Sequence, residues 1–160
     1  GTRVHWCLEQ RLRGRPVELP TDDEAARAMV SQAFAWCDDH KPLVPKLRAV
    51  PAVEYTVLST EYWYTGTVDF LTKIRPVKDN LGLELWDVKT TKEVRDSAHK
   101  QASAYIHALR EMGVPVLRGK ILHIKEDGYS VIDVKDMWPQ FLAALEFKRA
   151  HRKPRALGVT

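Results

Sequence analysis

The chain has little cysteine, no long apolar run and no glycine-rich phosphate loop, and each lack removes a class of protein. Two cysteines, Cys7 and Cys37, are too few for a four-thiolate iron–sulfur cluster or a structural zinc site. No apolar run approaches the roughly 20 residues of a membrane helix. The phosphate loop of nucleotide-driven motors is missing, so we expect no nucleotide cofactor. The chain also lacks the Gly-x-Ser-x-Gly elbow of serine hydrolases and the His-Glu-x-x-His zinc motif.

What the chain does contain is typical of a globular protein. Its 160 residues are 44% hydrophobic and 29% charged, and this length suits a single domain over residues 1–160. The formal net charge of +4 leans weakly toward polyanionic partners. No signal-peptide pattern is visible at the N-terminus. Cys7 and Cys37 could form one disulfide, but we expect buried free thiols in a reducing compartment.

The hydrophobic periodicity predicts an alternation of helices and strands. Helices are expected at residues 3–13, from an N-cap at Thr21 to about His40, at 95–112, and from Asp136 onward. Strands are expected at 53–58, 62–72, 83–90, 116–125 and 129–134, with a polar turn at 76–82. This order predicts an α/β domain whose central mixed sheet of about five strands is flanked by helices.

An acid and a lysine stand two residues apart in the apolar run 83–90, and a second acid stands in the strand-like run 62–72. Asp87 and Lys89 should face the same side of a sheet as Leu85, with Trp86 and Val88 on the other side. Asp69 should lie on a neighbouring strand. Two carboxylates can hold a hard divalent cation beside a phosphate, with the Val88 carbonyl as a third ligand. The alternative is a pair of solvent-facing acids, one of them paired with Lys89.

Four short motifs follow one another along the chain: His5, Gly66-Thr67-Val68-Asp69, Asp87-Val88-Lys89, and Gln101 with Tyr105 four residues later. Together they resemble the PD-(D/E)XK nuclease superfamily, and more closely its RecB-like exonuclease branch without the iron–sulfur cluster. The resemblance spans residues 5 to 105 and says little about residues after about 112. It implies a restriction-endonuclease-like core around the predicted sheet.

The resemblance also implies roles for further side chains. His5 would be a metal ligand, alternatively a histidine packed on an amphipathic helix. Gln101 and Tyr105, one helical turn apart, would contact the nucleic-acid backbone or orient Lys89, alternatively they pack the helix. Glu54 would lie near the metal and the substrate, alternatively it is a half-exposed strand acid.

From these motifs we expect a DNA exonuclease that uses one or two Mg²⁺ or Mn²⁺ ions and acts from single-stranded ends in replication, repair or recombination. Its catalytic residues would be Asp69, Asp87 and Lys89. It would work in the cytoplasm or another DNA-containing compartment, whether bacterial, phage-infected or organellar, without binding a membrane. Two rivals stay open: a non-catalytic nucleic-acid-binding module on the same fold, and a nuclease that acts on RNA.

Overall fold

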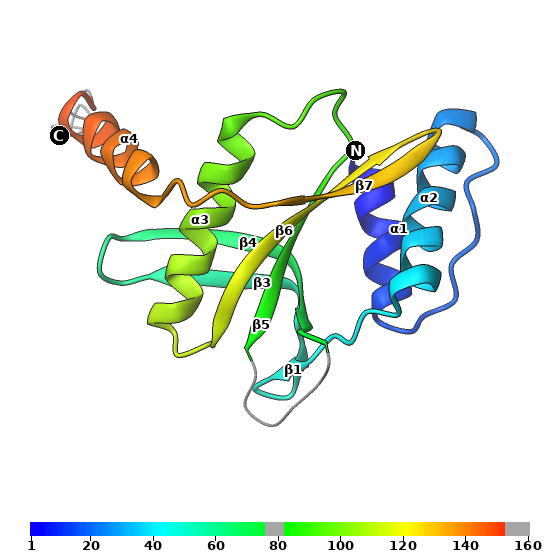
Figure 1. Ribbon diagram of the computed structural model, residues 1–160, viewed down its shortest axis with the longest axis horizontal. Coiled ribbons are helices and arrows are strands. Elements are labelled where there is room, and N and C mark those ends of the chain that lie inside the picture. Colours follow the sequence, from blue (N-terminus) through cyan, green and yellow to red (C-terminus); the bar gives the residue numbers. More distant parts are fainter. Residues whose placement is uncertain (76–81, 153–160) are drawn as a thin grey trace, which may run out of the picture.

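The computed structural model describes residues 1–75 and 82–152, which form a mixed five-stranded sheet with helices on both faces (Figure 1). The sheet order is β3-β4-β5-β6-β7, and β5 and β6 are parallel whereas the other neighbours are antiparallel. These strands span Val53–Ser59, Tyr64–Lys73, Leu83–Lys89, Val116–Lys125 and Gly128–Asp133. The predicted α/β architecture is confirmed.

Helices α1 (Thr2–Leu12) and α2 (Glu24–His40) cover one face of the sheet, and α3 (Asp96–Glu111) covers the other (Figure 1). α3 is also the crossover that joins the parallel strands β5 and β6, a connection that requires a helix-length segment. α4 (Trp138–Ala150) extends away from the sheet and has no buried residue.

Each face of the sheet has its own apolar core. Trp36 of α2 packs against Phe70 and Trp86 on one face, with ring centroids 5.6 and 4.8 Å away. Leu85 lies in the second cluster, which contains the apolar face of α3. The alternation predicted for β5 is therefore correct: Trp86 and Val88 belong to the first core and Leu85 to the second.

Some local predictions were wrong. The N-cap of α2 is Asp23, whose side chain accepts a hydrogen bond from the Ala26 N–H, and not Thr21. A small hairpin, β1 (Lys46–Leu47) with β2 (Val50–Pro51), was not expected. The polar turn predicted at 76–82 lies almost wholly outside the described residues. Both cysteines are free and buried, as expected.

The site depends on a point where two strands separate. β4 and β5 pair from Lys73 opposite Leu83 to Phe70 opposite Trp86, and the ladder ends there. Continued by one residue, the same register places Asp69 opposite Asp87. Before this point, residues 64–68 of β4 pair with β3 alone. The two acids therefore stand where β4 leaves β5 and the sheet opens.

Among the described residues, no helix is both long and apolar enough to cross a membrane.

Candidate active site

Asp69 and Asp87 converge where β4 and β5 separate. Beyond the end of the ladder, the Val88 N–H is free of β4 and donates to Asp69 Oδ2 at 2.7 Å. The Asp87 residue is 8% exposed, and its Oδ2 is buried without accepting a hydrogen bond. Lys89 Nζ lies 3.3 Å from this oxygen, so the two groups form an ion pair. The angle between them does not suit a hydrogen bond.

The surroundings oppose ionisation of both acids. The pKa of Asp69 is raised to about 7, chiefly by burial and also by the nearby Asp87 carboxylate, while the hydrogen bond from the Val88 N–H acts in the opposite sense. Burial also raises the pKa of Asp87, against the lowering effect of Lys89. Two crowded, poorly solvated carboxyls with an unsatisfied oxygen fit a hard divalent cation, which would compensate their charge.

Lys89 is connected to α3 through a polar side chain. Its Nζ donates to Gln101 Oε1 at 3.4 Å, and the Tyr105 hydroxyl interacts with Gln101 and with the backbone of Thr67. Gln101 thus links the lysine to the tyrosine, as the expected orienting role requires. Lys89 Nζ lies 3.3 Å from Asp87 Oδ2, which brings Lys89 and Gln101 to the acids. Burial and, to a smaller extent, the nearby Asp87 carboxylate raise the pKa of Tyr105, so the tyrosine lies close to them as well.

Gly66 makes room for this tyrosine. A Cβ built on Gly66 would lie 2.2 Å from a ring carbon of Tyr105, far inside van der Waals contact. The glycine of the Gly-x-x-Asp motif therefore serves close approach between β4 and α3, one of the two roles that strand glycines commonly have. Any larger residue would move Tyr105 away from the acids.

His5 approaches the acids from α1, on the opposite side of the sheet from α3. Its Nε2 lies 2.8 Å from the Val88 carbonyl oxygen and 3.8 Å from Asp69 Oδ2, and its Nδ1 lies 2.8 Å from the Gly1 carbonyl oxygen. The predicted ligands are therefore neighbours. To bind a metal, His5 would have to exchange the Val88 contact for the ion, because Nε2 cannot donate a hydrogen and ligate at once.

Glu54 lies with His5 and Asp69 around a small cavity, which Glu9 of α1 also lines. Burial and the neighbouring Glu9 raise the pKa of Glu54. Its φ of 49° is left-handed, an uncommon conformation for a residue with a side chain. The structure thus places Glu54 near the acids, on the His5 side and not among the residues around Lys89.

Two residues of this corner were not singled out from the sequence. Glu9 pairs with Arg13 at 3.2 Å, and Arg13 Nη2 donates to the Val53 carbonyl at 3.1 Å. The signal for Glu9 was present, because it follows His5 by four residues and so lies on the same helix face. Arg13 carried no such signal, since its partner lies 40 residues away.

A groove of about 680 Å³ adjoins the acids on the other side of Lys89. Lys89 and Gln101 line one end of it, and the connection between β5 and α3 lines the rest. Lys92, Glu93 and Arg95 in this connection were not predicted as site residues. The groove therefore extends the candidate site toward the N-terminus of α3.

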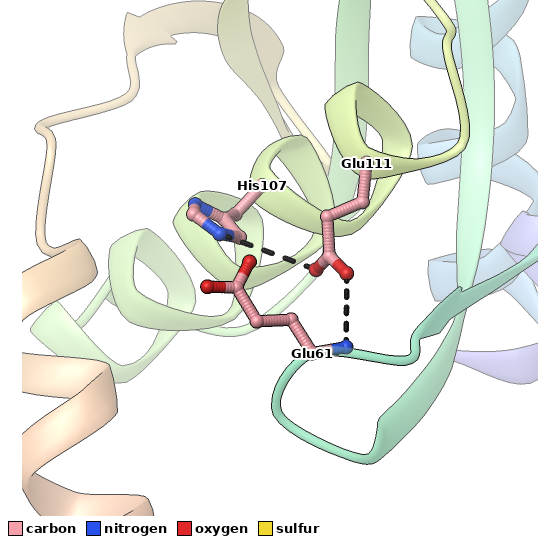
Figure 2. A group of neighbouring side chains, drawn as sticks. All are labelled: Glu61, His107 and Glu111. Atoms are coloured by element: carbon pink, nitrogen blue, oxygen red, sulfur yellow. Dashed lines mark hydrogen bonds and ion pairs between the residues drawn. The ribbon is translucent and has the colours of Figure 1, made fainter.

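A second group of acids with a histidine lies elsewhere and was not predicted (Figure 2). Glu61 precedes β4, while His107 and Glu111 are one turn apart on α3, and their ligand atoms all lie within 4.8 Å of one another. The trio of His5, Asp69 and Asp87 forms no such compact group among the described residues. Glu111 already accepts hydrogen bonds from the Ser59 hydroxyl at 2.5 Å and the Glu61 N–H at 3.1 Å.

No family model matches this chain, and no curated protein matches it significantly. The functional assignment therefore depends on the motifs and on the geometry described above.

Proposed function

We propose that this protein is a divalent-metal-dependent nuclease of the PD-(D/E)XK type, with Asp69, Asp87 and Lys89 as catalytic residues. One observation carries the proposal: two poorly solvated carboxyls oppose each other where the strands separate, and a buried Asp87 oxygen accepts no hydrogen bond. Neither a packed core nor a solvated surface needs this arrangement, whereas a cation site does. The order of the motifs from His5 to Tyr105 supports the same assignment.

The side chains have distinct tasks in this proposal. Asp69 and Asp87 would hold Mg²⁺ or Mn²⁺, with the Val88 carbonyl and His5 as further ligands. One or two such ions, when bound, supply a Lewis acid for the phosphate and a water of lowered pKa.

The rest of the chemistry falls to groups that the chain itself positions. The Val88 N–H fixes the Asp69 carboxyl so that it faces Asp87. Lys89, oriented by Gln101, is placed to donate to a phosphate oxygen or to the attacking water, and so to stabilise negative charge that develops there. The Tyr105 hydroxyl interacts with the Gln101 side chain and would help to hold it in this orientation.

The finer assignment is an exonuclease that acts on DNA from a single-stranded end in replication, repair or recombination. It is supported by the RecB-like motif order alone. Competition between DNA and RNA strands of the same sequence tests the choice of nucleic acid, because an enzyme directed at RNA would be inhibited more strongly by the RNA strand.

A cleavage assay with two substrates tests the proposal. We expect end-labelled linear single-stranded DNA to be degraded with Mg²⁺ or Mn²⁺ and closed circular single strands to survive. Lys89→Ala should slow the reaction by about 10²–10³-fold without unfolding the protein, whereas Lys125→Ala, at an exposed position at the end of β6, should not change it. An inert wild-type protein refutes the nuclease, a fully active Lys89→Ala refutes the mechanism, and efficient cutting of circles refutes the exonuclease.

A further inference from the structure

The groove beside Lys89 carries a concentration of positive charge that the chemistry proposed above does not use. It is lined by three cations and one acid, together with small polar and apolar residues: Lys89, Thr91, Lys92, Glu93, Val94, Arg95, Ser97, Ala98 and Gln101. We propose that this groove binds phosphates of the strand being cleaved, next to the reacting one, and that Lys92 and Arg95 are the residues that bind them. The inference rests on the proposed function, which supplies the strand.

Lys92 and Arg95 are available for a ligand. Both are exposed, and in the described part of the chain neither side chain makes an ion pair or a hydrogen bond. Some other cations of the protein are engaged: Arg11 pairs with Asp38 at 2.6 Å, and Arg118 pairs with Glu84 at 2.6 Å. Two unpaired cations at the edge of one groove favour an anion that binds to both.

The segment that presents these cations is held in place. The carbonyl of Thr91 lies 2.6 Å from Nε2 of His123, a buried residue of β6, and the Thr91 hydroxyl donates to the Glu93 carbonyl at 2.8 Å. Lys92 lies between these two anchored residues. A binding segment that is already ordered loses less conformational entropy when a ligand binds.

The beginning of α3 brings the positive end of the helix dipole to the same groove, and the Asp96 carboxylate in the first turn opposes it in part. Arg95 is the N-cap and provides no side-chain acceptor for the first turn, and Ser97 and Ala98 of that turn line the groove. The Ala98 N–H is satisfied by the Arg95 carbonyl, whereas residues 96 and 97 precede the first helical hydrogen bond. This potential reinforces the two side chains, which carry the proposal.

The residues that line the groove also indicate that it does not recognise the bases of the strand. It contains no aromatic side chain on which a base could stack, and Gln101, its one amide, is already occupied by Lys89. Lysine and arginine that contact phosphates contribute affinity without reading sequence. Because Lys89 belongs to both the groove and the catalytic site, the ligand must span both, as neighbouring phosphates of one strand do.

Binding measured without divalent cations tests the groove separately from catalysis. The probe is a fluorescent single-stranded DNA of mixed sequence, titrated with protein in EDTA across a salt series and followed by anisotropy. For Lys92→Ala and for Arg95→Ala we expect affinity at low salt to fall about fivefold and the slope of log K against log salt to become shallower by about 0.7 each. Two homopolymeric DNAs should show the same loss.

Two further variants make the result specific. Arg95→Lys should keep the salt slope, because it keeps the charge, and Lys125→Ala at the distant turn should behave as the wild type. In the cleavage assay, Lys92→Ala and Arg95→Ala should raise KM with kcat unchanged. An unchanged slope in both alanine variants overturns the proposal, as does binding of polyglutamate in place of DNA.

The outcomes separate this inference from the proposed function. If the wild type does not cleave but Lys92→Ala and Arg95→Ala lose affinity for the strand, the groove stands and the nuclease falls. If cleavage depends on Asp87 and Lys89 while both groove variants bind and cleave normally, the nuclease stands and the groove falls.

Discussion

Among the described residues, two groups combine acids with a histidine: Asp69 and Asp87 with His5, and Glu61 and Glu111 with His107. The groups differ in the hydrogen bonds that their carboxylate oxygens accept. At the separating strands, Asp87 Oδ2 is buried without accepting a hydrogen bond, and burial raises the pKa values of Asp69 and Asp87. In the second group, both Glu111 oxygens accept hydrogen bonds, one from Ser59 at the end of β3 and one from Glu61 in the β3–β4 turn. Similar residue types therefore leave a buried carboxylate oxygen without a hydrogen bond in one place and form a structural tie in the other.

The environment of the histidines differs in the same sense. His107 stacks on Trp138 with ring centroids 3.7 Å apart and meets Tyr62 edge-on, so aromatic packing holds its ring. His5 contacts the backbone carbonyls of Gly1 and Val88 and lies 3.8 Å from the Asp69 carboxylate. A cation would gain most at Asp69 and Asp87, even though Glu61, His107 and Glu111 form the more compact group. We therefore expect a buried carboxylate without a hydrogen bond to mark the metal site better than proximity of ligand atoms alone.

The largest expected effect comes from removing the Asp87 carboxylate. Asp87→Asn should reduce cleavage by about 10³-fold, because a neutral amide neither binds the cation nor positions Lys89. The same variant should be more stable than the wild type by about 1–2 kcal/mol at neutral pH without divalent cations, since burial of the Asp87 carboxylate, which raises its pKa, outweighs the ion pair with Lys89. Single-turnover cleavage and urea denaturation in EDTA measure the two effects. A variant that loses both activity and stability would show that Asp87 is a structural ion pair.

A second expected effect concerns pH. The pKa of Asp69 is raised from 3.8 to about 7 in the folded state, so the folded protein keeps a proton that the unfolded chain releases. Stability without metal should therefore be greatest below about pH 4 from this group and should fall as pH rises toward 7, by at most about 4 kcal/mol. Denaturation between pH 4.5 and 7.5 measures the slope.

Two controls identify the group responsible for this slope. Asp69→Asn should flatten it, because the amide does not titrate. Mn²⁺ should also reduce it by compensating the ionised carboxyls. Glu111→Gln should leave the slope as it is in the wild type, and a steep dependence that survives Asp69→Asn would assign the effect to other groups.

The smallest effect is expected in the second group. Glu111→Gln replaces one accepting oxygen by a donor that faces the Ser59 hydroxyl or the Glu61 N–H, so we expect a loss of about 1–2 kcal/mol in stability. Cleavage should stay within about twofold of the wild type. A tenfold loss of cleavage at unchanged stability would place this group in the reaction and would reverse the comparison.

The element pattern followed from the chain alone because periodicity reports local geometry. The two-residue alternation in the run 83–90 predicted which side chains of β5 face each core, and the helix predicted at 95–112 agrees with α3 to within one residue at each end. Competition between nearby capping residues was harder to judge. Thr21 and Asp23 both suit an N-cap, and the acid provides it.

The motif order brought His5, Asp69, Asp87, Lys89, Gln101 and Tyr105 together before any coordinates, and the structure places them at one site. The sequence could not reveal the groove or the tie through Glu111. Ser59 and Glu111 lie 52 residues apart, and their contact depends on how α3 packs across β3 and β4.

The amino-acid sequence by itself determined the helices and strands, the faces of β5 and the set of residues able to hold a cation, because these depend on neighbours along the chain. Only the tertiary structure decided which of the acids keeps a buried oxygen without a hydrogen bond. Burial, the end of the β4–β5 ladder and the direction of Lys89 set the electrostatic balance at Asp69 and Asp87, and each is a property of segments that meet in space.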